Sequence, residues 1–152
     1  MINGLPLTGS KSAGPMEPED QPFPENQLGP LVERRSVTPG YLEAMRISIV
    51  DGRSLAWGDQ GDEFRGVVIN ATLASAFWPD QAAVGRRIRS QGSEHSWEVV
   101  GVAADVRFDS VEDEPLPLVH LPIIAGNAEE LSLVRSVDVV VRVGAAPLDA
   151  IA

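Results

Sequence analysis

The chain has 152 residues, of which 43% are hydrophobic and 22% are charged, so it is long enough for one ordinary domain or two small lobes. Asp and Glu number 22 against 12 Lys and Arg, which gives a formal net charge of -10. This balance excludes the basic surface that nucleic-acid binding requires, so we expect no nucleic acid among its partners. The sequence contains no Cys, which excludes a disulfide framework and a thiolate metal site.

Proline is concentrated in the first 30 residues, which hold six of the 12 prolines together with Glu17, Glu19, Asp20 and Glu25. Each proline lacks a backbone N–H and biases its predecessor away from helix. Residues 1–30 are therefore predicted to be an extended or partly disordered lead-in without regular structure. We expect the folded domain to span residues 31–152.

The next part of the chain alternates short apolar runs with turn residues. Residues 31–37 alternate well enough for a strand. Thr38 followed by Pro39 predicts a helix start, with Thr38 as N-cap and Pro39 at the first helical position. Tyr41 would lie on the buried face of that short helix.

Residues 47–50 form a brief apolar stretch closed by Asp51-Gly52, a pair that favours positive φ at the glycine. Residues 53–65 are expected to be an irregular connection. Residues 66–69 are typical of a buried strand, and Asn70 is well placed to cap a helix that ends at Pro79. That helix would carry an apolar face made by Leu73, Ala74, Phe77 and Trp78.

The second half of the sequence predicts mainly strands. Residues 86–90 and 96–102 flank a polar loop and predict a hairpin. Further strands are expected at 118–121 and 137–143, the latter being rich in β-branched residues. A helix that begins near Pro147 reaches the last residue after about one turn, which favours a segment of a longer polypeptide.

No motif for a nucleophilic elbow, a phosphate-binding loop or a zinc-binding helix is present in the sequence. His95 and His120 lie 25 residues apart without a Cys or a second His at helical spacing, so we interpret both as ordinary polar positions rather than metal ligands.

Clustered carboxylates are the nearest approach to a catalytic or calcium site in the sequence. They lack the spacing of a calcium-binding loop, and Arg107 stands among them as a neutraliser, so a solvated turn in which Asp105 pairs with Arg107 is the favoured interpretation. A small acidic hydrolase that uses Asp105 is an alternative, although no nucleophile is visible beside these acids. The cluster consists of Asp105, Asp109, Glu112, Asp113 and Glu114.

The three tryptophans are expected in different environments. Trp78 continues the apolar helix face and Trp97 begins a valine-rich strand, so both are predicted to lie in the core. Trp57 lies in a Gly- and Asp-rich connection and is the candidate for an exposed contact residue. A secreted carbohydrate- or peptide-binding module that uses Trp57 is therefore an alternative function.

Several short segments over residues 32–143 occur in an order and spacing that resemble the MacB-like periplasmic domain of ABC transporter permeases, a family that also includes lipoprotein-release and FtsX-like proteins. The segments include Val37–Leu42, Asp51–Arg53, Val68–Asn70, Val84–Ile88 and Trp97–Val102. The residues that carry this resemblance are structural: Thr38, Pro39, Gly40, Tyr41, Gly52, Arg53, Asn70, Trp78, Pro79, Gly85, Gly101, Asp105 and Arg107.

The resemblance implies an α+β fold with mixed sheets and short helices, in which a distal lobe is accompanied by an incomplete βαβ lobe near the membrane. It also implies an extracytoplasmic domain at the inner membrane of a bacterium, with no enzymatic activity and no cofactor. The implied partners are a cytoplasmic ATP-binding cassette subunit, a second permease copy and a periplasmic adaptor protein.

Overall fold

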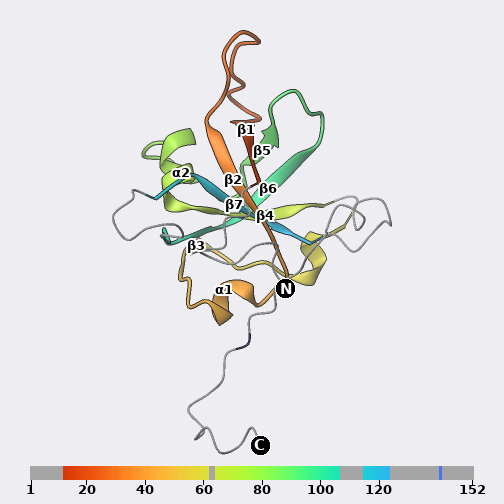
Figure 1. The fold of residues 1–152 in the computed structure, drawn as a ribbon, viewed down its shortest axis with the longest axis vertical. Coiled ribbons are helices and arrows are strands. Elements are labelled where there is room, and N and C mark those ends of the chain that lie inside the picture. The colour runs from red at the N-terminus through yellow and green to blue at the C-terminus, as the bar shows by residue number, and fades with distance from the viewer. Residues whose placement is uncertain (1–11, 62–63, 107–114, 124–140, 142–152) are drawn as a thin grey trace, which may run out of the picture.

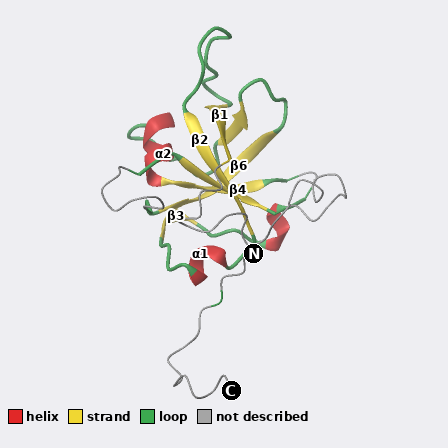
Figure 2. Ribbon diagram, in the orientation of Figure 1, coloured by secondary structure: helices red, strands yellow, loops and turns green. Residues whose placement is uncertain are grey.

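The computed structural model describes residues 12–61, 64–106, 115–123 and 141. The fold is α+β, as predicted, with one mixed sheet and two short α-helices among the described residues (Figures 1 and 2). None of the described helices is long and apolar enough to cross a membrane. The elements in chain order are β1 Ser12–Pro18, β2 Leu31–Val37, α1 Tyr41–Ala44, β3 Ile49–Gly52, η1 Trp57–Asp59, β4 Gly66–Asn70, α2 Ala71–Phe77, β5 Arg87–Ser90, β6 Ser96–Ala103 and β7 Leu118–Pro122.

The sheet closes on itself. Its strand order is β3-β6-β4-β7-β2-β1-β5, and an additional pairing joins β5 to β6. Strands β6, β4, β7, β2, β1 and β5 therefore form a ring, with β3 added beside the C-terminal half of β6. The β4–β6 and β2–β7 pairs are parallel and the other pairs are antiparallel. Closure matters because it pairs strand edges that would otherwise be open to other chains.

The inner apolar cluster receives side chains from every strand of the ring. Helix α2 contributes Leu73 and Phe77, and Trp78 follows at its C-terminal cap. Burial of this apolar surface is the main force that holds the ring together. The strand residues of the cluster are Met16, Val32, Val67, Ile69, Ile88, Val99, Val102 and Val119.

A second apolar cluster lies on the opposite face of the sheet, where α1 packs through Tyr41 and Leu42. Adjacent residues of β4 and β6 divide between the clusters: Val68 and Val100 join this one, whereas Ile69 and Val99 join the other. Strands β4 and β6 are thus covered on both faces, which matches the buried strand predicted at residues 66–69.

Most of the predicted elements are confirmed. The strand at 31–37 has the predicted bounds, and the predicted hairpin is formed by β5 and β6. Asn70 caps α2, Trp78 is buried and Trp97 is half-buried against the inner cluster. The strand predicted at 137–143 and the helix predicted from Pro147 lie outside the described residues, apart from Val141.

The prediction that residues 1–30 lack regular structure is wrong for residues 12–18, which form β1. Residues 12–15 of β1 pair only with β2, and residues 16–18 pair only with β5. Apart from the change of partner, where the Met16 N–H donates to the Pro30 carbonyl and the Gln91 N–H donates to the Pro15 carbonyl, each half of the strand is bonded on a single side. Pro15 and Pro18 can therefore be accommodated without their missing N–H groups.

The helix start predicted at Thr38 is also wrong. Helix α1 begins at Tyr41, and its N-cap is Gly40 with φ 88° and ψ -8°. The Tyr41 N–H donates to the Thr38 carbonyl at 3.2 Å, so Thr38-Pro39-Gly40-Tyr41 is a type II turn. Proline suits its second position and only a residue that tolerates positive φ suits its third, which explains the Pro39-Gly40 pair.

Acidic residues at the end of β1 and directly after it pair with basic residues on and beside β5. Arg89 Nε donates to Glu17 Oε1 at 2.8 Å, and Glu17 is 3% exposed. Arg87 lies 3.7 Å from Glu19 in a more exposed pair. Asp20 pairs with Arg86, whose guanidinium lies over the Trp78 ring. The acidic residues of the N-terminal segment therefore secure it to β5.

Substitution of Arg89 tests this attachment. Arg89→Met would leave the buried Glu17 carboxylate with the Phe23 N–H as its remaining hydrogen-bond donor among the described residues. Removing one partner of a buried pair costs about 3–5 kcal/mol, and partial exposure of the Arg89 side chain reduces the expected loss to about 2 kcal/mol. Urea denaturation of the wild type and of Arg89→Met measures this loss of unfolding free energy.

Arg87→Met is the matched control, because the Arg87–Glu19 pair is exposed on both sides. It is expected to lower the free energy of unfolding by at most about 0.5 kcal/mol. Equal losses in the two variants would contradict the role assigned to the Glu17–Arg89 pair.

Candidate functional site

The Asn70 side chain joins three segments that are far apart in the sequence. Its Oδ1 accepts from the Leu73 N–H at 3.1 Å and from the Leu118 N–H at 3.0 Å. Its Nδ2 donates to Asp105 Oδ1 at 2.7 Å and to the Leu116 carbonyl at 2.9 Å. Two donors and two acceptor positions are the full capacity of an amide side chain, so Asn70 ties the start of α2 to the segment after β6 and to the start of β7.

Asp105 provides a second cap for α2. Its Oδ1 accepts from the Thr72 N–H at 3.0 Å as well as from Asn70, and an acidic group at this end also suits the helix dipole. The expected partner of Asp105, Arg107, lies outside the described residues, as do Asp109, Glu112, Asp113 and Glu114. The described contacts assign Asp105 a structural role.

The segment after β3 is fixed by a bidentate ion pair. Arg53 donates to both carboxylate oxygens of Asp59, at 2.6 and 2.8 Å, and the Ala56 N–H donates to the same carboxylate at 2.7 Å. Burial alone would raise the pKa of Asp59, but the hydrogen bonds from Arg53 and Ala56 outweigh it and lower the pKa below its usual value. Asp59 is 1% exposed, so this pair holds η1 in place.

Two glycines allow this segment to approach β6 closely. Gly52 has the predicted positive φ, 70°, and a Cβ on Gly101 would lie 2.0 Å from the Arg53 carbonyl oxygen. Gly85 also has positive φ, 84°, and donates its N–H to the Val99 carbonyl. At these positions a side chain would strain the backbone or collide with it.

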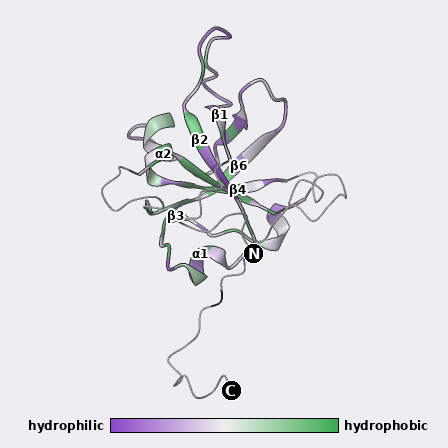
Figure 3. Ribbon diagram, viewed as in Figure 1, coloured by the Kyte–Doolittle hydropathy of each residue, from purple (hydrophilic) through white to green (hydrophobic). Residues whose placement is uncertain are grey.

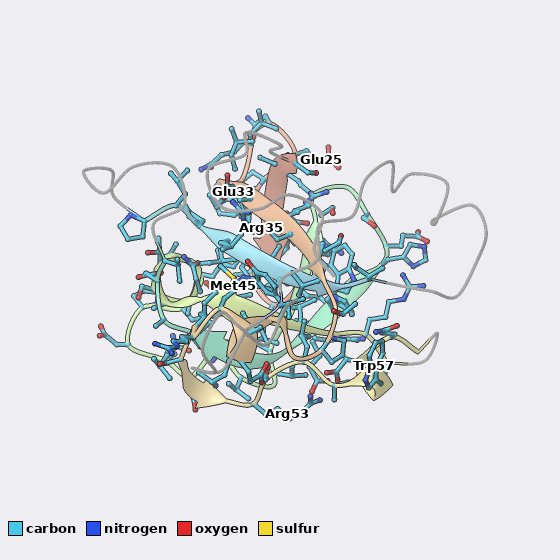
Figure 4. All side chains as sticks on the ribbon, turned by 60° about the horizontal axis from the view of Figure 1, so that its bottom comes forward. Glu25, Glu33, Arg35, Met45, Arg53 and Trp57 are labelled. Carbon is cyan, nitrogen blue, oxygen red and sulfur yellow. The ribbon has the colours of Figure 1, made fainter. Side chains whose placement is uncertain are left out.

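Trp57 begins η1 and is 68% exposed, which confirms the expected exposure. Figure 4 places it beside the segment that carries Arg53. Its role as a contact residue stays a prediction.

Charged and polar side chains lie buried on the same face of the sheet as α1, and none of them was assigned a role from the sequence. Glu33 and Arg35 project from the same face of β2, with Glu33 Oε2 3.5 Å from Arg35 Nη2 (Figure 4). His120 faces Arg35 in the β2–β7 register, and its ring centroid lies 6.1 Å from that of Tyr41. The polar stretch inside β2 is visible in Figure 3 as a change from green to purple, but nothing in its spacing showed that it would be buried.

His120 is uncharged in this environment. Burial, followed by the positive charge of Arg35, lowers the pKa of His120 to about 4. The backbone of Val68, which lies opposite His120 in the β4–β7 register, opposes part of this shift. His95 lies in the exposed β5–β6 turn, and within residues 12–61, 64–106, 115–123 and 141 no group of three acidic, His or Cys residues could hold a metal ion.

A groove of about 530 Å³ opens between the β1–β2 connection and the end of β5. We call it the tip groove, because the β1–β2 connection projects from the side of the molecule opposite α1 (Figure 1). It was not predicted from the sequence, because residues 19–30 were expected to lack structure. It is lined by Pro15, Glu17, Pro22, Phe23, Glu25, Leu28, Arg89, Gln91 and Gly92.

The chain belongs to the family of MacB-like periplasmic core domains, whose model matches residues 13–151. A search of curated proteins gave no match.

Solved structures of related domains share the fold. The periplasmic region of MacB from Actinobacillus actinomycetemcomitans has a TM-score of 0.53 at 15% identity, over 74% of this chain and 44% of that one. The extracellular domain of the ABC-type transporter YknZ from Gram-positive bacteria has a TM-score of 0.50 at 17% identity, over 74% and 51%. A domain described as a permease protein from Porphyromonas gingivalis has a TM-score of 0.53 at 20% identity, over 79% and 50%. The chain thus spans about half the length of these structures.

The Asn70 junction yields a stability prediction. Asn70→Ala removes four hydrogen bonds and leaves the Leu73 and Leu118 N–H groups without their acceptor, so it should cost about 3 kcal/mol or more of unfolding free energy. Asp105→Ala removes an exposed cap and should cost about 1 kcal/mol. Chemical denaturation measures the unfolding free energy of both variants. A loss in Asn70→Ala that is no larger than the loss in Asp105→Ala would contradict the central role of Asn70.

Burial of His120 predicts a pH dependence of stability. Its pKa is about 4 in the folded protein against an ordinary value of 6.5, so between these values the unfolded chain binds a proton that the folded chain does not. The contribution is fully present above pH 6.5 and is lost as the pH falls toward 4, by about 3 kcal/mol in total.

His120→Met removes this titration while it retains an apolar side chain of similar size. Urea unfolding between pH 7.5 and 4.5 should show a steeper loss of stability in the wild type than in His120→Met, even though the carboxylates titrate in both. Parallel curves would show that the folded protein accepts the proton on His120 without cost.

Proposed function

We propose that this chain forms part of the extracytoplasmic domain of a bacterial ABC transporter permease at the cytoplasmic membrane. In this proposal, a separate cytoplasmic subunit hydrolyses ATP, and the permease transmits the movement to this domain. The domain has no turnover of its own. Its partners are a second permease copy and, outside the membrane, cargo or a periplasmic adaptor protein. Membership of the family of MacB-like periplasmic core domains supports the general assignment.

The closed strand ring is the observation that carries the mechanical part of the proposal. A part that transmits displacement must keep its own shape while it moves. The ring pairs six strands in sequence around one apolar core, and the Asn70 junction links α2, the segment after β6 and β7 through side-chain hydrogen bonds. Relative sliding of these segments would break several bonds at once, so the described part is suited to move as one body.

Distance measurements between spin labels test this proposal in the full-length permease assembled with its ATPase subunit. The chain contains no Cys, which leaves engineered sites free of background from this domain. Glu94→Cys, in the exposed β5–β6 turn, gives one label on each of two permease copies. We expect the distance between the two copies to change between the ATP-bound and ADP-bound states.

A pair of spin labels within one permease copy is the control. Ser75→Cys on the exposed side of α2, combined with Glu94→Cys, reports the shape of the domain itself. This distance is expected to stay constant through the ATPase cycle. An unchanged distance between copies would overturn the proposed transmission of movement, and a changed distance within one copy would overturn the single-body interpretation.

A further inference from the structure

The tip groove is held open by contacts on both of its sides. The Phe23 N–H donates to Glu17 Oε2 at 3.1 Å. The Gly29 N–H donates to Gln91 Oε1 at 3.1 Å, while Gln91 Nε2 donates to the Gln27 carbonyl at 2.7 Å. Gly29 also packs closely against β1: a Cβ at this position would lie 2.4 Å from the Met16 carbonyl oxygen. The β1–β2 connection is therefore fixed to β1 and β5, and the groove is formed before any ligand arrives, which lowers the entropic cost of binding.

Apolar side chains line the groove and continue beyond it. Pro15, Pro22, Phe23 and Leu28 contribute to the walls. Leu28 is 80% exposed at the rim, and Leu31, which pairs with Pro15 in the strand register, is 68% exposed. A small molecule within the groove would leave Leu31 uncovered, because Leu31 does not belong to the lining. A protein segment that enters the groove and rests on its rim would cover both leucines, as interfaces do.

The charges of the groove favour a cationic partner. Glu17 and Arg89 neutralise each other in the floor, at 2.8 Å. Glu25 is exposed at the rim and has no ion pair with any described residue. The lining therefore carries one uncompensated negative charge, and the net charge of the chain is -10. This charge disfavours a second copy of the chain as the occupant, because two such copies repel each other.

We infer that the tip groove binds a segment of a partner protein in which an apolar side chain lies next to a lysine or arginine. The apolar side chain enters between Phe23 and Leu28, and the basic side chain pairs with Glu25. This site deepens the proposed function, on which it rests for the existence of a partner outside the membrane. It identifies where the partner docks and which chemistry it presents.

Selection from a random seven-residue peptide library displayed on phage tests the inference on the purified chain. The library is first depleted on a Leu28→Ser/Glu25→Gln double variant and then selected on the wild type. Both side chains are exposed, so the double variant is expected to fold normally. We expect enriched peptides in which an apolar residue lies within two positions of Lys or Arg.

Binding of a synthetic enriched peptide then measures each contribution. At low salt, Glu25→Gln should weaken binding about 2- to 5-fold, and Leu28→Ser about 5-fold or more. Glu94→Gln and Leu116→Ser are the matched controls, because they make the same changes at exposed positions outside the groove. Both should bind as the wild type does.

The inference would be overturned by no enrichment on the wild type, by enriched peptides without basic residues, or by binding that Leu28→Ser and Glu25→Gln leave unchanged. Self-association of the wild type that Leu28→Ser abolishes would assign the groove to a second copy instead, and would also overturn it. The experiment needs neither membrane nor ATPase. Its failure is therefore distinguishable from a failure of the distance measurements between permease copies.

Discussion

The closure of the sheet through β1 is the constraint on which the rest of the structure depends. The strand changes partner between Pro15 and Met16, from β2 to β5, and so completes the ring at the point where two strands would otherwise be left as edges. Met16 is fully buried in the inner cluster, and Glu17 anchors Arg89 directly beside it. Without β1, the inner core would lose one wall and the tip groove would lose its floor.

Local signals in the sequence predicted the elements whose stability is decided within a few residues. The alternation at 31–37, the cap at Asn70 and the polar turn between β5 and β6 each act over one strand, one helical turn or one hairpin. The cap was predictable because Asn accepts from the third helical N–H in many helices. That the same side chain also binds the Leu116 carbonyl and Asp105 depends on the tertiary fold, so no local pattern showed it.

Apart from the helix start, which a local turn at Pro39-Gly40 moves to Tyr41, the errors arose where distant partners determine the outcome. Proline density correctly indicates missing donors, but β1 is bonded on one side over most of its length, so the missing donors cost little. Glu33 and Arg35 lie in a strand of otherwise typical appearance, yet both are nearly buried, beside an uncharged His120. Charged residues predict exposure unless they are paired, and the pairing of Glu33 with Arg35 on the α1 face becomes visible only once the ring has determined which face of β2 points inward.

The position of the tip groove connects the proposed binding site to the proposed mechanical role. Its two sides are the β1–β2 connection and the end of β5, and the Glu17–Arg89 pair joins β1 to β5 at the groove. The Asp20–Arg86 pair ties the start of the connection to the residue before β5. A force applied by a bound partner would therefore be carried into β1 and β5 together, rather than into a loop that could bend independently. Both strands contribute to the inner core, and through Trp78 the Asp20–Arg86 pair also reaches the end of α2. A partner held at the tip would thus be coupled to the whole ring, as a domain that transmits displacement requires.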